Sequence, residues 1–441
     1  MTLERKKSLF SITIPIFLEL LLVTVVGNID TIMLGRFSDK AVGAVGGMSQ
    51  VLLIQNTILS FICLGTTILM AQFIGAKNHK STKEVIAVSL IMNLFIGLVL
   101  GVIYFIGWEW ILIKIKLPLA LRDMGMNYFK LVGGLCVFQA ISLTNGAILK
   151  SYGNTKPMLF VNIGVNLLNI LGNGMFIFGW MGAPVLGVTG VGISTVFSRF
   201  IGAIASVVVM SYFCSFRFED LKKFTFDKVK KILSIGIPTA GEHLTWSLTQ
   251  VIILSMVNTM GTTQITARTY LALISSFIMI FSIALGHGTA IQVGQLVGAG
   301  DKEKAYDQCM KSLTMSFIAA TIISVLVYFF RYGIMEMFTK DTEVIQIAAK
   351  VFPWMIYIET GRTFNIVVIN ALHAAGDIKF PMIMGCVVML GVAAPLSWVL
   401  GIKMEWLLVG VWIANGTDEW IRGFGMLWRW KTKRWMAKGF V

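Results

Sequence analysis

The stretch LFSITIPIFLELLLVTVVGNIDTIML, residues 9–34, decides the fold class of this chain. Its only charged residues are Glu19 and Asp30, and the rest is almost entirely apolar. As a helix, about 20 apolar residues are enough to cross the hydrocarbon core of a bilayer, which is about 30 Å thick. The run lacks the alternation of a barrel strand, and backbone polar groups in lipid need partners within their own segment, so we expect a membrane-spanning helix.

Similar runs fill the chain of 441 residues. Hydrophobic residues make up 56% of it and charged residues only 13%, whereas about a quarter of the residues in soluble domains are charged. The composition therefore predicts an all-α polytopic membrane protein with twelve transmembrane helices, separated by polar turns that contain glycine. The predicted spans are 9–34, 44–74, 85–107, 125–149, 157–179, 188–213, 236–260, 263–296, 308–330, 345–374, 381–401 and 407–428.

The distribution of Lys and Arg predicts which side of the membrane each loop faces. If the N-terminus is cytoplasmic, the inner segments hold most of the basic residues, with the largest clusters in 217–231 and 429–438. We therefore expect a multi-pass protein of the cell (plasma) membrane with both termini in the cytoplasm. The net charge of +15 follows from this asymmetry and from attraction to an anionic leaflet, so no nucleic-acid partner is expected.

The sequence repeats itself at a single offset, the one that brings Pro15 onto Pro238, which we call the repeat shift. Without a gap, the same shift aligns further uncommon residues in pairs: Glu19 with Glu242, Gln72 with Gln295, Gly153 with Gly376, and Arg199 with Arg422. Each half then holds six spans in the same orientation. We expect two six-helix bundles related by a pseudo-twofold axis along the membrane normal, with a substrate cavity between them.

This repeat sets the predicted domains: an N-terminal lobe over 1–213, a basic amphipathic linker helix over 214–235 on the cytoplasmic face, and a C-terminal lobe over 236–441. Two lobes that enclose a cavity can open alternately to either side of the membrane. This arrangement is typical of a secondary active transporter.

Several motifs resemble the multidrug and toxic compound extrusion (MATE) family. The segments PIFLELLLVTVVGNIDTIMLGRFSDKAVGAVG, NGAILKSYGNTKP, NLLNILGNGMFIFGW, LGVTGVGISTVFSR, IQVGQLVGAGDKEKA and ALHAAGDIKFP occur in the family's order over nearly the full length. The resemblance implies a two-lobed exporter with twelve helices that exchanges protons or sodium ions for small organic, often cationic, substrates. We expect a monomer in the lipid bilayer that carries no cofactor.

Asp30 is the principal candidate for cation coupling. A lone acid in a membrane helix costs about 3 kcal/mol on insertion scales and usually faces a cavity. Asp30 precedes Arg36 by six residues, about 9 Å of helix. Asn173 lies at about the same depth before the outer end of its span and shares a helix face with Asn169, while Thr195 lies about 12 Å into the next span.

These polar side chains suit two tasks. Their oxygens could bind a dehydrated sodium ion at Asp30, or they could surround a carboxyl group that takes up a proton. Two other interpretations stay open: Asp30 could cap a neighbouring helix or pair with Arg36, and the asparagines could serve only to hold helices together.

The resemblance is closer to the DinF-like branch of the family than to the NorM type. In that branch an Asp on helix 1, fifteen residues after a helix-bending proline, is taken as the cation site, and Asp30 follows Pro15 by that spacing. The family's Asn and Thr partners fall on Asn169 and Thr195, but the second acid of that branch is Asn173 here. The NorM-type acids of helices 7 and 10 are replaced by Trp246 and Arg362.

Weaker candidates lie elsewhere in the spans. Glu19, Glu242, Glu359 and Trp246 are candidates for the lining of the substrate cavity. Alternatively, Glu19 and Glu242 reach water at the inner end of their spans, and Glu359 forms an ion pair with Arg362, three residues on. Asp418, Glu419 and Arg422 predict a similar charge network.

No metal-binding or catalytic motif is found. His243, His287 and His373 lack the spacing of a metal site, and the chain shows neither a nucleophile–base pair nor a filter-like segment, so we expect neither an enzyme nor a channel. The remaining alternative is a flippase for lipid-linked glycans of a related superfamily, which would need a strongly cationic cavity. The intramembrane arginines that favour it are Arg199, Arg268, Arg362 and Arg422.

Overall fold

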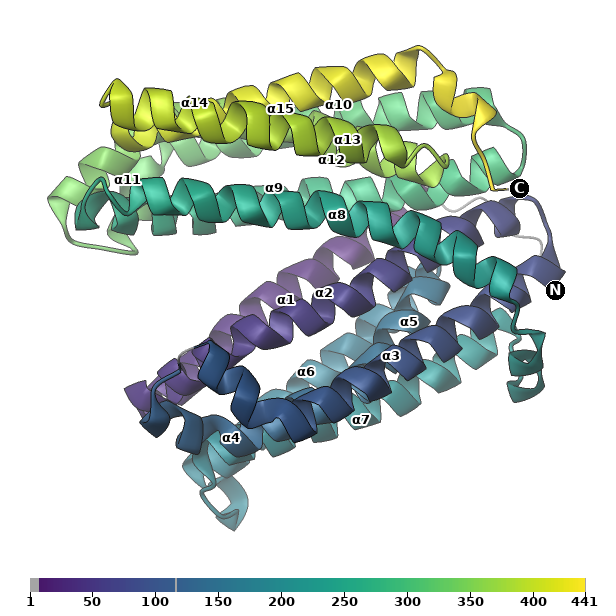
Figure 1. Cartoon of the computed structure of the whole chain (residues 1–441), viewed down its shortest axis with the longest axis horizontal. Coiled ribbons are helices and arrows are strands. Elements are labelled where there is room, and N and C mark those ends of the chain that lie inside the picture. Colours follow the sequence, from purple (N-terminus) through teal and green to yellow (C-terminus); the bar gives the residue numbers. More distant parts are fainter. Residues whose placement is uncertain (1–7, 116, 441) are drawn as a thin grey trace. The chain divides into compact units, whose positions relative to one another are not determined.

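The structure is a computed structural model that describes residues 8–115 and 117–440. Every regular element in this part of the chain is helical (Figure 1). The two ends of the chain, for which a cytoplasmic position is predicted, include residues 1–7 and 441, which lie outside the described part.

Long helices account for both halves of the sequence. The first half contains α1 (Leu9–Phe37), α2 (Asp39–Gly75), α3 (His79–Lys114), α4 (Leu119–Gly134), α5 (Val137–Ser151), α6 (Thr155–Phe178) and α7 (Gly187–Cys214). The second half contains α8 (Phe226–Val257), α9 (Thr262–Gly298), α10 (Lys302–Phe329), α11 (Arg331–Glu336), α12 (Thr342–Ala374), α13 (Lys379–Val388), α14 (Ala394–Trp398) and α15 (Leu407–Lys431).

Each predicted span coincides with one helix or with one broken helix. Within the described residues, 8 helices are long and apolar enough to cross a membrane, and the pair α4 and α5, bent by 43°, forms a ninth candidate. The remaining three predicted spans are α8, α12 and α15. These helices carry charged residues, which lower their hydropathy; in α12 and α15 several of these are buried.

Local chemistry explains where several helices begin, break and end. The side chain of Asn78 accepts a hydrogen bond from the backbone N–H of Ser81 and starts α3, and Asp341 caps α12 in the same way. Gly179 ends α6 in the left-handed conformation, with φ of 72°. Pro395 has no backbone N–H to continue the helix, and a π-helical turn precedes it between α13 and α14.

The chain divides into two compact units. The first contains Leu18–Ile74 and Asn78–Gly236, and the second contains Ser8–Phe17, Gly75–Lys77 and the chain from Ile237 onward. The boundary in α1 follows shortly after Pro15, which lies inside the helix. Because proline cannot donate to the carbonyl of Ser11, one turn earlier, α1 lacks one ladder hydrogen bond where it passes from one unit to the other.

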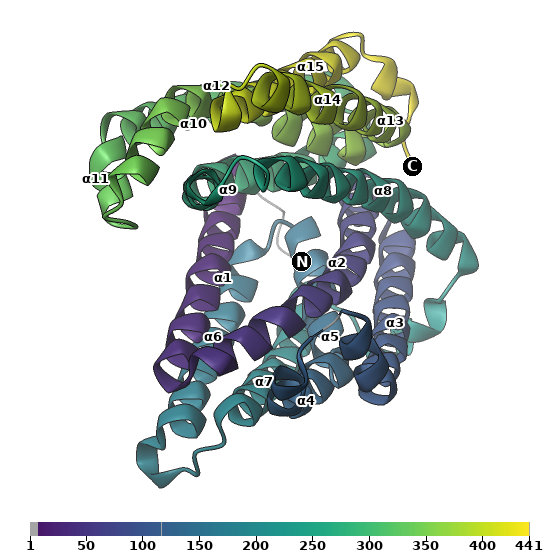
Figure 2. The ribbon, with the colours of Figure 1, turned by 60° about the vertical axis from the view of Figure 1, so that its left-hand side comes forward.

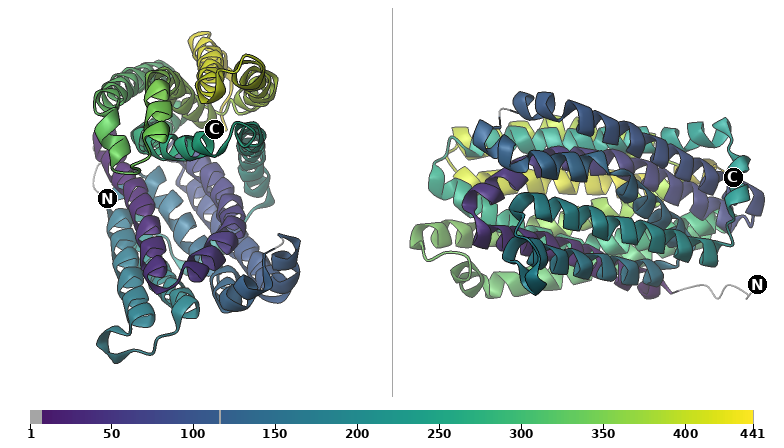
Figure 3. Two further views of the ribbon diagram at one scale, coloured as in Figure 1. Left: turned by 90° about the vertical axis from the view of Figure 1, so that its left-hand side faces the viewer. Right: turned by 90° about the horizontal axis from the view of Figure 1, so that it is seen from below.

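Helix packing differs little in kind between the units. In the first, α7 packs against α4, α5 and α6 (Figure 2). A cluster of buried apolar side chains from α1, α2, α3, α4, α6 and α7 includes Met48, Tyr104 and Phe129. In the second, α12 packs against α9, α10 and α15 (Figure 3). There the largest buried side chains include Phe352, Trp430 and Trp435.

The linker differs from the prediction. We expected one amphipathic helix over 214–235, but α7 ends at Cys214, a short 3-10 helix covers Phe218–Lys223, and α8 already begins at Phe226. Asp220 explains the break. Its carboxylate accepts hydrogen bonds from the backbone N–H of Arg217 and from Lys83 and Lys223, which hold the segment in a compact turn against α3.

Candidate functional site

Asp30 contacts α6 through one hydrogen bond, whose donor is a neutral amide. The amide Nδ2 of Asn173 donates to Oδ1 of Asp30 over 2.8 Å. Asn173 is fully buried, whereas Asp30 is half-buried. Within the described residues, the Oδ1 atom of Asn173 has no hydrogen-bond partner. A carboxylate and an unpaired amide oxygen thus lie on adjoining side chains in the apolar interior of the first unit.

Asn169 faces the neighbouring helix. Its Nδ2 donates to Oγ1 of Thr195 over 3.2 Å and lies 3.5 Å from Oγ of Ser194. Ser194 in turn donates to the backbone carbonyl of Asn169 over 2.8 Å. One turn of α6 therefore separates a contact with α1, through Asn173, from a contact with α7, through Asn169. Of the four residues proposed for coupling, the structure joins Asp30 to Asn173 and Asn169 to Thr195.

The alternative interpretations of Asp30 lack support in the structure. Asp30 lies inside α1, and its carboxylate accepts a hydrogen bond from the side chain of Asn173, not from the backbone at a helix end. Among residues 8–115 and 117–440, neither Arg36 nor any other cation lies within 4.0 Å of its carboxylate. The charge that acts on Asp30 is that of Arg199 on α7, beyond ion-pair distance.

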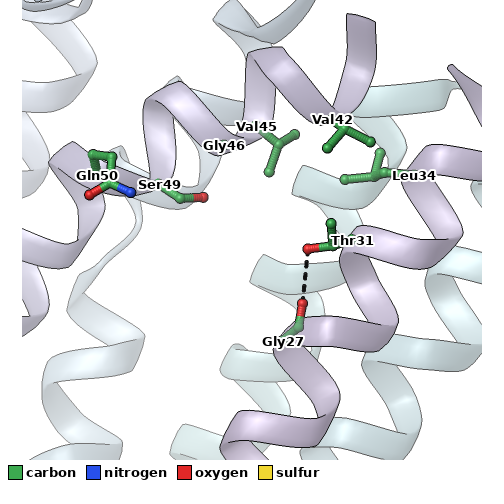
Figure 4. A pocket seen from close by; sticks show the side chains of 8 residues that line it. All are labelled: Gly27, Thr31, Leu34, Val42, Val45, Gly46, Ser49 and Gln50. Atoms are coloured by element: carbon green, nitrogen blue, oxygen red, sulfur yellow. Dashed lines mark hydrogen bonds between the residues drawn. The ribbon is translucent and has the colours of Figure 1, made fainter. Parts of the chain in front are cut away.

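A small cavity opens beside the same part of α1 (Figure 4). It has a volume of about 290 Å³ and lies between α1 and α2 in the first unit. Thr31, next to Asp30, lines it and donates to the carbonyl of Gly27 over 3.1 Å (Figure 4). Ser49 and Gln50 add polar groups from α2. Asp30 itself is not among the lining residues, since successive helix residues point about 100° apart.

Glu19 is bound rather than open to a cavity. Its Oε2 lies 2.8 Å from Nζ of Lys150 on α5, and its Oε1 accepts a hydrogen bond of 3.0 Å from Asn162 on α6. In the second unit Glu242 faces His373 over 3.7 Å. Trp246 is 44% exposed and packs edge-on against His243.

Glu359 belongs to a buried charge network. Its carboxylate lies 2.6 Å from Nη1 of Arg362 and accepts a hydrogen bond from Ser275. Arg362 continues to Glu419 over 3.3 Å. Arg422 lies 2.5 Å from Asp418 and 3.1 Å from Glu419. The network predicted for α15 is therefore present and is joined to the pair on α12.

This network weakens the flippase alternative. A flippase for lipid-linked glycans would need arginines that offer unpaired positive charge to a pyrophosphate group. Arg362 and Arg422 are instead bound by three carboxylates in the second unit.

The repeat-related arginines Arg199 and Arg422 have different surroundings. The repeat shift places Thr195 and Val196 where the second half has Asp418 and Glu419. Arg422 therefore finds its acids on its own helix. Arg199 has none there, and in the described chain no carboxylate lies within 4.0 Å of it, so its charge acts across helices on Asp30. The two arginines that the repeat shift aligns therefore do not have equivalent partners.

Sequence reasoning missed two residues of this site. Ser194 gives no signal of its own, because serine is common in membrane helices and only the packing of α6 on α7 reveals its role. Arg199 was visible as an intramembrane cation, but its action on Asp30 depends on the positions of α1 and α7. No cluster of three or more metal-ligating side chains occurs in the part of the chain that the structure describes.

Comparisons with known proteins agree with this architecture. A model of the MatE family matches residues 15–175 and again residues 238–399, which confirms the internal repeat at the predicted shift. The transporter YisQ of Bacillus subtilis, described as uncharacterized, is 41% identical over 99% of this chain and 97% of its own length. A probable multidrug resistance protein NorM of Thermotoga maritima is 26% identical over 94% of this chain and 90% of its own.

Solved structures show the same fold. A crystal structure of a variant of the Vibrio cholerae MATE transporter VcmN superimposes with a TM-score of 0.86 at 16% identity and covers 98% of both chains. A MATE structure in a bent conformation has the same TM-score at 17% identity and covers 98% of this chain and 96% of its own. The predicted all-α layout of twelve helices in two bundles is confirmed as that of these transporters.

Proposed function

The chain belongs to the MatE family, and from this premise we propose that it exports small organic, often cationic, compounds in exchange for inward-moving protons or sodium ions. Several relatives are described as probable multidrug resistance proteins, which supports this substrate class. The exchange would proceed by alternating access and would couple to the cation through Asp30. The observation that carries the proposal is the state of the Asp30 carboxylate, held by one amide and by no ion pair within 4.0 Å in the described part of the chain.

The interactions of Asp30 with its neighbours would differ between its ionised and its neutralised form. Ionised, the carboxylate keeps the hydrogen bond from Asn173 and attracts Arg199. When a proton or sodium ion binds, the attraction of Arg199 falls, and the pull between α1 and α7 falls with it. Two states that bind the cation and the substrate unequally are sufficient for coupling.

A coupling site at Asp30 agrees with the DinF-like branch, because the acids of the NorM type are missing from the second unit. Trp246 and Arg362 occupy the positions of the NorM-type acids, and Arg362 is already bound to Glu359. Coupling would therefore rest on the first unit. Asn173 offers an amide where that branch has a second acid, so the site holds a single carboxylate for either ion.

The test is transport in proteoliposomes with the pH gradient and the sodium gradient imposed separately. With ethidium as a cationic probe, we expect one of the two inward gradients to drive export by the wild type, and Asp30→Asn to reduce this coupled transport at least tenfold while ethidium still binds. Asp39→Asn is the matched control, because Asp39 is exposed at the start of α2. Normal gradient-driven export by Asp30→Asn would overturn the coupling role. Export by the wild type under neither gradient would overturn the exchange mechanism.

A further inference from the structure

Glu242 and His373 face each other in the second unit without a hydrogen bond. Oε2 of Glu242 on α8 lies 3.7 Å from Nε2 of His373 at the end of α12, and the two side chains are 15% and 4% exposed. A hydrogen bond between such atoms requires about 3.2 Å or less. Within the described residues, both atoms lack any hydrogen-bond partner. Two buried polar atoms thus point at each other unsatisfied, which is unfavourable unless something joins them.

In the first unit, the acid that corresponds to Glu242 has its hydrogen-bonding partners in place. The repeat shift maps Glu19 onto Glu242 and Lys150 onto His373. Nζ of Lys150 lies 2.8 Å from Glu19, and Asn162 adds a hydrogen bond of 3.0 Å. This acid therefore has both a lysine ammonium and an amide as donors.

The second unit lacks both of these partners. The counterpart of Asn162 is Gly385 on α13, where an added Cβ would lie 3.3 Å from Cγ of Glu242. A glycine at this position brings α13 close to the acid but offers no side-chain donor. The remaining partner is an imidazole, which is a cation only after it takes up a proton.

Other charges near the pair are already bound. Arg422 on α15 acts on Glu242, but it lies 2.5 Å from Asp418 and 3.1 Å from Glu419.

Asp377, which follows α12, acts on His373, but it lies 2.6 Å from Arg429 and 2.8 Å from Lys438. Among the other helices packed against α12, α9 carries a further titratable imidazole in the same half, His287.

We propose that Glu242 and His373 form a proton-binding site of the second unit that takes up one proton from water and shares it between Oε2 and Nε2. The proton satisfies both atoms wherever it sits. It gives either an imidazolium beside a carboxylate or a carboxylic acid that donates to a neutral imidazole, and both forms draw the two atoms into hydrogen-bond contact. No other reactant is needed.

The site also ties two helices in a pH-dependent way. Glu242 follows Pro238 by one turn in α8, so the shared proton fastens α8 to α12 next to a position where the helix ladder is interrupted. In the first unit the ion pair between Lys150 and Glu19 joins α1 to α5 at the equivalent place. This inference goes beyond the proposed function, which rests on Asp30 in the other unit.

The test counts protons on the purified full-length chain. A jump from pH 8 to pH 5 in the presence of an indicator dye measures proton uptake, and Glu242→Gln and His373→Gln should each bind one proton fewer than the wild type. The double variant should also bind only one fewer, because the pair shares that proton. Losses that add to two would show independent groups, and an unchanged count would show no site; either result overturns the proposal.

The repeat supplies matched exchanges that keep a charged pair in place. His373→Lys copies the first unit and should lose one proton of uptake, whereas Lys150→His copies the second unit and should gain one. His287→Gln serves as the control, because His287 lies on the neighbouring helix α9. The change in proton uptake caused by His287→Gln should be the same with and without Glu242→Gln. Thermal melting checks that each variant is folded. The measurement does not depend on transport. A negative result here would therefore not bear on the coupling role of Asp30, and normal transport by Asp30→Asn would not bear on the Glu242–His373 site.

Discussion

Asn173 donates a hydrogen bond of 2.8 Å to Asp30 across the contact between α6 and α1. This bond joins the acid of the first helix to a residue that is fully buried, and it leaves the carboxylate without a bound cation in the described part of the chain. The second unit treats its acids differently, since Glu359, Asp418 and Glu419 are each bound by an arginine. The first unit therefore leaves Asp30 without a bound cation, whereas these three acids of the second unit belong to one charge network.

Replacing Asn173 by leucine should impair coupling. Asn173→Leu keeps the volume of the side chain but removes the donor to Asp30. Hydrogen bonds to charged groups contribute about 1.5–3 kcal/mol, so we expect cation-driven export of ethidium in proteoliposomes to fall by about tenfold to a hundredfold. Asn127→Leu on α4, at an exposed position, is the control. Equal activity of the two variants would contradict the role of this bond.

Adding one methyl group at Gly172 should disturb the site through α7. A Cβ at this position would collide with Oγ of Ser194, and Ser194 is bonded to Asn169. Overpacking of this kind costs about 1–3 kcal/mol, so Gly172→Ala should lower both the apparent melting temperature and the coupled transport. Gly164→Ala on the same helix meets no atom within 4 Å and should leave both unchanged. A melting temperature of Gly172→Ala that matches this control would refute the prediction.

The repeat-related arginines should differ in their effect on stability. Arg422→Met leaves Asp418 and Glu419 without their shared cation, and breaking a buried pair in this way costs about 3–5 kcal/mol. Arg199→Met removes a charge with no carboxylate within 4.0 Å in the described chain, so its cost should be much smaller. Thermal unfolding of the two variants in the same detergent measures this difference. A larger loss for Arg199→Met would show that the first unit also depends on a charge pair.

Asp220 should hold the linker together at neutral pH. Although burial opposes its ionisation, hydrogen bonds from Lys223, the backbone of Arg217 and Lys83 hold the pKa of this carboxyl well below its usual value of 3.8. A carboxyl group with a lowered pKa stabilises the folded state above its unfolded pKa, and this contribution is lost only as the pH falls below that value toward the folded pKa. Wild-type linker contacts should therefore persist down to about pH 4.

Hydrogen exchange of the linker backbone tests this pH dependence. Asp220→Asn should lose amide protection around the 3-10 helix Phe218–Lys223 already at pH 7, because the amide cannot replace the ionised carboxylate toward two lysines. Glu219→Gln changes the neighbouring acid, which is exposed, and should keep the protection. Protection that survives in Asp220→Asn would mean that the turn is held by other contacts.

The sequence alone determined the class of the fold and its repetition. Runs of apolar residues longer than the bilayer core leave helices as the only way to satisfy the backbone in lipid, and they predicted each span to within a few residues at most ends. The repeat shift predicted the duplication, because Pro15 and Glu19 recur as Pro238 and Glu242. The prediction of one linker helix was wrong. Its amphipathic pattern does not show that the Asp220 carboxylate accepts three hydrogen bonds, which hold the segment in a turn and interrupt the helix.

The pairing of polar side chains was decided only by the tertiary structure. Periodicity places Asn169 and Asn173 on one face of α6, but it does not say that one turns to α7 and the other to α1. Equivalent positions such as Lys150 and His373 are visible in the sequence, yet their distances to Glu19 and Glu242, 2.8 Å and 3.7 Å, are not. The physical reason is that hydropathy depends on each residue separately, whereas a hydrogen bond or ion pair depends on the relative position of two helices.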